Sequence, residues 1–153
     1  MSQLKSRKRQ DYPYFLSYRT RWSDNDQYSH VNNSAYNLWF DSIINTYFIE
    51  HCAMDPATTK RMGLVISSTC DFFAPLSFPQ IVDLGLRVNK LGNSSMVYET
   101  AVFAEGSDVP AAVGTYTLVF VDRATSRSAP MEPQMRQALG RLVLGPESVP
   151  AKL

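Results

Sequence analysis

Residues 33–50 read NSAYNLWFDSIINTYFIE and decide the fold. Apolar side chains recur every four residues in two neighbouring rows, a pattern typical of a long helix buried along one side. The two rows are Ala35, Trp39, Ile43 and Tyr47, and Tyr36, Phe40, Ile44 and Phe48. Asn32 or Asn33 can cap this helix, because a short amide side chain accepts hydrogen bonds from the first helical turn.

Segments that alternate like β-strands lie on both sides of this helix. Residues 14–22 alternate before it, and four further strands are expected after it, at 64–73, 81–91, 96–105 and 111–122. Short turns at 92–95 and 106–108 join the last three strands, so we expect them to form an antiparallel meander. The order predicts an α+β fold, in which a curved antiparallel sheet of five to six strands wraps around one long central helix.

Length and composition predict a single domain over residues 1–153. The chain is 44% hydrophobic and 19% charged, which is too apolar for a disordered protein. A net charge of +1 gives no reason to expect nucleic acid as a partner. No run of eighteen apolar residues occurs, so no membrane span is expected. Residues 1–12 are expected to form a flexible basic tail, and residues 123–153 a C-terminal extension with a short helix at 134–144.

The two cysteines, Cys52 and Cys70, indicate free thiols and not a disulfide framework. They also lack the spacing of metal ligands. No secretory apolar segment follows the basic residues near the N-terminus. We therefore expect a reducing compartment, the cytoplasm or alternatively the mitochondrion.

A polar cluster stands between the first strand and the helix, where residues 22–33 read WSDNDQYSHVNN. Such groups are costly to bury unless they pair or take part in chemistry, and a helix N-terminus stabilises an anion or a carbonyl oxygen. A carboxylate can attack a carbonyl carbon or take a proton from water. Asp26 is therefore a candidate base or nucleophile, the amides around Asn33 are candidate oxyanion donors, and His30 is a candidate supporting group. Asp24 and Asp26 are equally typical of turns and caps.

The same stretch has some likeness to a metal-binding loop. Asp24, Asp26 and Tyr28 occupy alternate positions, as ligands do in a calcium-binding EF-hand. The glycine of that loop is missing, however, and Ala35 stands where the final glutamate is required. Zinc would need more histidine or cysteine than the cluster offers. We therefore expect neither a metal nor another cofactor.

The polar cluster and the helix start together resemble the signature of hotdog-fold thioesterases. The pattern WSDxDxxxHVNNxxYxxW at 22–39 is similar to that of the 4-hydroxybenzoyl-CoA thioesterase-like family, and to one half of plant acyl-ACP thioesterases. The similarity continues through DFFAPL at 71–76 and VFVDR at 119–123. This resemblance implies a hotdog fold and an acyl-CoA thioesterase that releases a free acid and a thiol. It also implies a homodimer or a dimer of dimers.

The resemblance assigns roles to particular residues of this chain. The catalytic aspartate of the family falls on Asp26, and the helix-start amide that polarises the thioester carbonyl falls near Asn33. The histidine of the acyl-ACP branch falls on His30, but the asparagine of that branch is replaced by Tyr28. The plant-type catalytic set is thus incomplete, and a mechanism centred on the aspartate is favoured.

Further residues are candidates for contact with the substrate. CoA carries phosphates, so basic residues are expected at the rim of the site, although each could equally be ordinary surface charge. Aromatic residues at the helix start can line an acyl pocket or belong to the core. The substrate-binding candidates are Asn32, Tyr36, Arg87, Lys90, Arg123 and Arg127.

Two other functions stay open. An enoyl-thioester hydratase shares the fold, but the resemblance to those enzymes requires an Asp and a His separated by four residues. Here three residues separate Asp26 from His30, and five separate Asp24 from it. The second alternative is a non-catalytic protein that binds acyl thioesters. In every case CoA or an acyl carrier protein would enter as part of the substrate.

Overall fold

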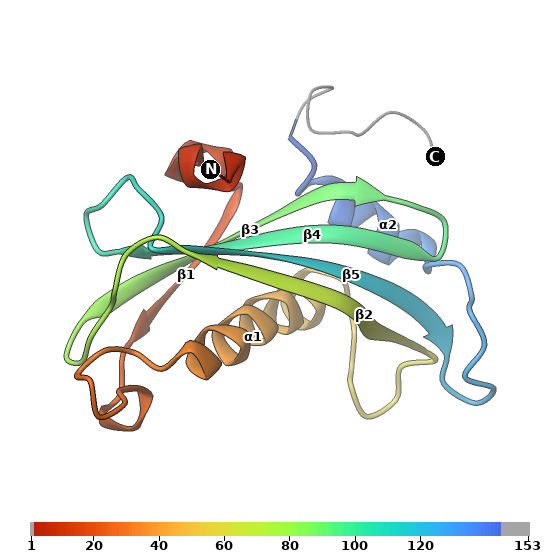
Figure 1. Cartoon of the computed structure of the whole chain (residues 1–153). Helices are drawn as coiled ribbons and strands as arrows, with labels where there is room; N and C mark the ends of the chain where they lie inside the picture. Colours follow the sequence, from red (N-terminus) through yellow and green to blue (C-terminus); the bar gives the residue numbers. More distant parts are fainter. Residues whose placement is uncertain (1, 145–153) are drawn as a thin grey trace.

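A five-stranded antiparallel sheet wraps one long helix in the computed structural model, which describes residues 2–144 (Figure 1). The sheet order is β1-β3-β4-β5-β2, so β1 and β2 form its two edges. The predicted α+β architecture is confirmed. Its main elements are β1 (Tyr14–Arg19), α1 (Asn33–His51), β2 (Arg61–Phe72), β3 (Ile81–Leu91), β4 (Ser95–Ala104), β5 (Ala112–Asp122) and α2 (Pro133–Gly140).

The predicted meander is formed by β3, β4 and β5, which pair in sequence order. Strand β1 pairs with β3 at one edge, and β2 pairs with β5 at the other. The chain between β1 and β2 is therefore the segment that crosses the sheet, and it contains α1. None of the helices in residues 2–144 is long and apolar enough to cross a membrane.

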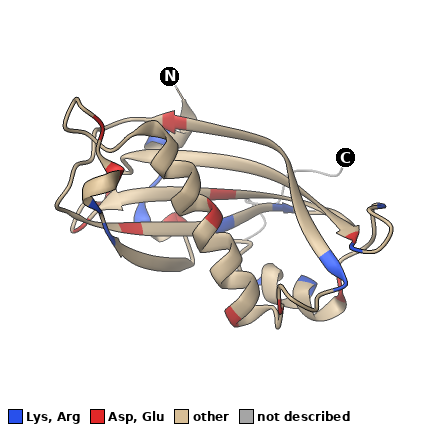
Figure 2. Cartoon of the chain, turned by 90° about the horizontal axis from the view of Figure 1, so that it is seen from below, with Lys and Arg blue, Asp and Glu red and all other residues tan. Residues whose placement is uncertain are grey.

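Helix α1 lies across the inner face of the sheet, as the view from below shows (Figure 2). Both predicted apolar rows are buried, and Phe40 and Ile43 have no exposed surface. Asn32 is the N-cap, since its side-chain oxygen accepts a hydrogen bond from the Ser34 N–H at 3.0 Å. A third row of α1 is polar and turns toward β5, where the Tyr116 hydroxyl donates to Asn37 Oδ1 at 2.7 Å.

The first strand ends earlier than its alternation predicts. It stops at Arg19, and residues Trp22–Asp24 form a 3-10 turn, η3. The turn is held by Asp24, whose carboxylate accepts from the Arg21 N–H at 2.7 Å. Trp22 is consequently 83% exposed and meets Phe78 edge-on instead of entering the core.

The expected flexible tail at residues 1–12 is wrong for the residues that the structure describes. They form two 3-10 turns, η1 (Gln3–Ser6) and η2 (Arg9–Asp11), on the outer face of the sheet. Tyr12 is buried there, with its ring 5.8 Å from that of Phe103. Arg9 pairs with Asp83 of β3 at 2.9 Å. The charge of this segment is therefore matched by acidic groups of the sheet, which a sequence reading cannot show.

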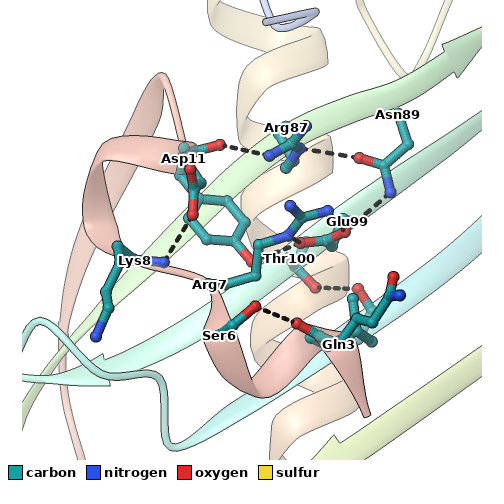
Figure 3. A network of polar contacts seen from close by, with 12 residues as sticks. Gln3, Ser6, Arg7, Lys8, Asp11, Arg87, Asn89, Glu99 and Thr100 are labelled. Carbon is teal, nitrogen blue, oxygen red and sulfur yellow. Dashed lines mark hydrogen bonds and ion pairs between the residues drawn. The ribbon is translucent and has the colours of Figure 1, made fainter. Parts of the chain in front are cut away.

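Glu99 is the centre of the polar network that joins the N-terminal segment to the sheet (Figure 3). It has no exposed surface, yet it stands in the middle of β4. Arg7 donates to both carboxylate oxygens at 2.8 and 3.0 Å, the Tyr12 hydroxyl donates at 2.6 Å and Asn89 Nδ2 at 2.9 Å. Burial opposes the charge of Glu99, but these hydrogen bonds outweigh burial and hold the pKa of Glu99 below its usual value.

We expect Arg7→Ala to lower the free energy of unfolding by about 2–3 kcal/mol, because it leaves a buried carboxylate with fewer partners. Urea unfolding at pH 7 measures this, with the exposed Lys5→Ala as the matched loss of a basic residue. Because folding lowers the pKa of Glu99, its contribution is full above the unfolded pKa of about 4.3 and is lost as pH falls through the folded pKa. Equal stability of the two variants at pH 7 would show that Arg7 does not hold this segment.

The C-terminal part confirms the short helix but gives it different bounds. Helix α2 covers Pro133–Gly140 and buries Met135, Ala138 and Leu139. The Tyr47 hydroxyl of α1 donates to the Ala138 carbonyl at 2.5 Å, which ties the two helices together. The rest of the predicted extension, residues 145–153, lies outside the described residues.

Candidate active site

The loop before α1 fixes the position of Asp26. The Asp26 N–H donates to the His30 carbonyl at 2.9 Å, and the Ser29 N–H donates to the Asp26 carbonyl at 3.1 Å. Ser29 has φ of 65°, the left-handed conformation that such a tight reversal requires. Asp26 Oδ1 accepts the Tyr28 N–H at 2.8 Å, which orients the carboxylate and leaves its other oxygen available.

A cavity of about 440 Å³ opens beside this loop. The three predicted catalytic residues Asp26, His30 and Asn33 all line it, and so does the substrate-binding candidate Tyr36. Asp26 also lines another hollow, with Trp22 and Phe78. Asp26 thus borders two hollows of the surface. The main cavity is lined by Asp26, Tyr28, His30, Val31, Asn33, Tyr36, Phe72, Phe73, Ala74 and Pro75.

The first amide of α1 is free to bind a ligand atom. The side chain of Asn32 occupies the Ser34 N–H, and the Ala35 N–H donates to the Asn32 carbonyl at 2.9 Å. Within residues 2–144, the Asn33 N–H has no hydrogen-bond partner. A helix N-terminus carries partial positive charge, so this amide is suited to an oxygen that gains negative charge.

Asp24 has a structural role in the loop, as is typical of a turn residue. It is 3% exposed, and Arg21 donates to it from both the backbone and the guanidinium group. Its carbonyl accepts the Asn32 N–H at 2.8 Å and so fixes the residue that caps α1. Asp24 does not line the main cavity, which separates the two acids of the motif into one that shapes the loop and one that faces the cavity.

Tyr36 and Phe72 form an aromatic wall of the cavity. Their rings meet edge-on at 5.0 Å, and Tyr36 is only 3% exposed. Burial, with a smaller effect of Cys70, raises the pKa of Tyr36 to about 12, so its hydroxyl is neutral at pH 7. The sequence did not identify Phe72, Phe73 or Pro75 as lining residues. They come from the end of β2 and the following loop, and only the folded sheet brings them to the helix start.

The buried guanidinium of Arg87 corrects one predicted phosphate contact. Arg87 is 5% exposed on the outer face of β3, beneath the N-terminal segment. It donates to the Asp11 carbonyl at 3.1 Å and to Asn89 Oδ1 at 2.9 Å. These contacts hold the segment to the sheet, and the group does not reach the cavity beside Asp26.

The other basic candidates lie at the end of the sheet opposite to the cavity beside Asp26. Strand β5 begins opposite Phe72, which lines the cavity, and ends at Asp122. At about 3.3 Å per residue, its length separates Arg123 and Arg127 from the site by roughly 30 Å. Lys90 lies near the far end of β3, since that strand begins opposite Arg19. A single copy of the chain therefore does not assemble the predicted cationic rim.

Together, one curved antiparallel sheet, one central helix and a polar loop at the start of that helix define a hotdog-fold protein. Residues 20–139 match the family described as the thioesterase-like superfamily, and the chain belongs to this family. No curated protein matches the chain.

Solved structures of bacterial proteins have the same fold. The PA5185 protein of Pseudomonas aeruginosa strain PAO1 is 46% identical, over 89% of this chain and 95% of that chain, with a TM-score of 0.87. The PA2801 protein of Pseudomonas aeruginosa, described as a candidate thioesterase, is 28% identical over 82% and 96% of the two chains, with a TM-score of 0.75. The gentisyl-coenzyme A thioesterase BH1999 is 21% identical over 82% and 99%, with a TM-score of 0.72, and shows likeness of fold alone.

Proposed function

We propose that this protein hydrolyses an acyl-CoA thioester, of a fatty or another acyl group, to a free acid and a thiol. One observation carries the proposal: Asp26 and Asn33 line the same cavity, and the Asn33 N–H has no hydrogen-bond partner in the described chain. A thioester hydrolase needs a group that delivers the attacking oxygen. It also needs a hydrogen-bond donor that stabilises the negative charge developing on the carbonyl oxygen. Membership of the thioesterase-like superfamily supports this chemistry.

The reaction follows from the two groups. The thioester oxygen accepts a hydrogen bond from the Asn33 N–H, and Asp26 either removes a proton from water or attacks the carbonyl carbon itself. The tetrahedral oxyanion then collapses, the C–S bond breaks, and the thiolate takes up a proton to leave as CoA thiol. Direct attack leaves an acyl-aspartyl anhydride, which water cleaves to the acid. His30 lines the same cavity, and in this proposal it orients the water or the leaving group.

The test is release of thiol from a panel of acyl-CoA substrates of different length, branching and aromatic content. We expect thiol and free acid in equal amounts from at least one member of the panel. Hydration of an enoyl-CoA without thiol would instead support the hydratase alternative. Tight binding of acyl-CoA without any product would support the non-catalytic binding protein.

We also propose that two copies of the chain pair through the edge strand β2. This strand exposes Leu64, Val65 and Ile66 at 46%, 47% and 65%. The unpaired N–H and C=O groups of an apolar edge strand can pair with a strand of another chain. In edge strands that stay unpaired, charged residues or proline normally prevent this pairing. Pairing of two β2 strands would join the two sheets of a homodimer, which can itself form a dimer of dimers.

Such pairing would also complete the cationic rim. Two antiparallel β2 strands that pair about their centres place the Arg61 end of one beside the Phe72 end of the other. Arg61 pairs with Asp122, so Arg123 belongs to the same end. In this dimer the Arg123 side chain of one copy approaches the cavity of its partner, where CoA phosphates need a cation.

We expect Ile66→Glu to convert a dimer into a monomer, because a twofold axis near the strand centre would bring two carboxylates together. Sedimentation equilibrium measures the mass. Ile49→Glu is the matched control, since Ile49 is 50% exposed on α1 and away from β2. A wild-type protein that sediments as a monomer, or an Ile66→Glu variant that stays dimeric, would rule out this interface.

A further inference from the structure

A second cavity, of about 220 Å³, lies between the second half of α1 and the first half of β2. Ile44, Phe48 and Leu118 form apolar walls, and all three are almost completely buried. Asp41 lines the cavity from the helix side. Asp41 is eight residues after Asn33, so it lies about 12 Å further along the helix axis than the candidate active site of the same copy.

Tyr98 presents an unused polar group to this cavity. The residue is 1% exposed and lines the cavity from β4. Among the described residues, its hydroxyl has no hydrogen-bond partner, whereas every fully enclosed side-chain nitrogen or oxygen has one. The hydroxyl must therefore open on the cavity. Since buried polar groups are almost always paired, an unpaired hydroxyl at a cavity wall indicates a place for a ligand atom.

The ring that carries this hydroxyl is firmly held. Tyr98 stacks on Tyr116 with ring centroids 5.1 Å apart and planes inclined by 8°. The Tyr116 hydroxyl is in turn bonded to Asn37 of α1. A side chain held in this way offers its hydroxyl at a fixed point, as a recognition group requires.

The surroundings of Tyr98 favour a neutral ligand group beside its hydroxyl. Burial, followed by Tyr116 and the Asp41 carboxylate, raises the pKa of Tyr98, so its hydroxyl stays protonated at pH 7. An anionic ligand group at this end would be repelled by Asp41. Of the two cations that line the cavity, Arg61 is paired with Asp122 at 3.1 Å, whereas Arg123 donates to the neutral Pro56 carbonyl at 2.8 Å and keeps its charge.

The volume limits the size of the ligand group. An apolar cavity of about 150 Å³ holds a benzene ring, so a cavity of this size accepts a ring with a small substituent, or a branched chain of equal bulk. Apolar walls and one polar point are typical of small-molecule sites.

We propose that this cavity binds a compact apolar group that ends in a hydroxyl, and that Tyr98 recognises the hydroxyl. The group can be the acyl part of the thioester or a free small molecule. The acyl case rests on the proposed hydrolase function and on the β2 dimer, which places this cavity beside the active site of the partner. Binding of a free ligand rests on neither.

Binding is tested with 4-ethylphenol and ethylbenzene, which differ only in the hydroxyl, by nuclear magnetic resonance titration of the full chain. We expect both to bind the wild type, with about fivefold preference for 4-ethylphenol. Tyr98→Phe should bind ethylbenzene equally and lose the preference, while Tyr14→Phe, which removes a hydroxyl outside the cavity, should keep it. Met54→Trp, at a half-buried lining position, should weaken both probes. No binding of either probe, or a preference that survives in Tyr98→Phe, would overturn the proposal.

The source of the group is distinguished by turnover of 4-hydroxyphenylacetyl-CoA and phenylacetyl-CoA. If the acyl part enters the cavity, Tyr98→Phe lowers the ratio of their kcat/KM values by about fivefold, while Tyr14→Phe leaves this ratio unchanged. An unchanged ratio, with the preference for 4-ethylphenol still lost, assigns the cavity to a free ligand. Absence of all thiol release would contradict the proposed hydrolase function, while the titrations would still decide whether the cavity binds.

Discussion

We expect Asp26→Asn to lower kcat for thioester hydrolysis about 1,000-fold, within the usual range for loss of a catalytic acid or base. The amide oxygen of asparagine can still accept the Tyr28 N–H that Asp26 Oδ1 accepts at 2.8 Å. The loop should therefore keep its shape while the group loses its ability to take a proton or to attack. Thiol release at saturating acyl-CoA measures kcat, and thermal unfolding checks that the fold is retained.

Asp55→Asn is a closely matched control for this substitution. Asp55 Oδ1 accepts the Ala57 N–H at 2.9 Å, which is the same local turn, but Asp55 lies after α1 and outside the cavity of Asp26. We expect its turnover to equal that of the wild type. A residual activity of Asp26→Asn close to that of Asp55→Asn would remove Asp26 from the mechanism.

Asn33→Pro should reduce kcat by about 100- to 1,000-fold, the usual effect of removing one oxyanion donor. Proline at the first helical position deletes the N–H and nothing else of the backbone hydrogen-bond pattern, because that N–H has no partner in the described chain. The preceding Asn32 has φ of −64° and ψ of 142°, a conformation that a following proline accepts. Helix α2 already begins with a proline at its own start.

The companion variant Asn33→Ala separates backbone from side chain. It keeps the N–H and removes the amide side chain, so we expect turnover within about threefold of the wild type if the N–H is the donor. Equal losses in both variants would assign the effect to the side chain. Full activity of Asn33→Pro would show that the carbonyl oxygen is held elsewhere.

The fold could be predicted because its main signal is local. The rows at spacing four, from Ala35 to Phe48, require a sheet on one side of the helix, and the alternation in 81–91 and 111–122 supplies the strands. Asp26, His30 and Asn33 could be placed together because they lie within eight residues of one another. A loop and a helix start so close in sequence meet in one place whatever the remainder of the sheet does.

The rest depended on contacts between distant segments. Arg87 was predicted to reach the substrate because CoA carries phosphates that basic residues can bind, but the N-terminal segment folds over it. Arg7 was predicted to belong to a solvated tail, because its partner Glu99 is 92 residues away and no residue near Arg7 in the sequence indicates the pair. Phe72 lines the site only because β2 pairs with β5 in one register. Alternation shows which residues share a face of a strand, and it does not show which strand lies beside them.

A single-turnover reaction of Asp26→Asn, with enzyme in excess over an acyl-CoA that the wild type hydrolyses, separates binding from chemistry. If Asp26 supplies or activates the attacking oxygen, the variant binds the acyl-CoA with the wild-type dissociation constant and releases thiol about 1,000-fold more slowly. Thiol release at the wild-type rate from the fully bound variant would contradict a mechanism in which this carboxylate drives hydrolysis.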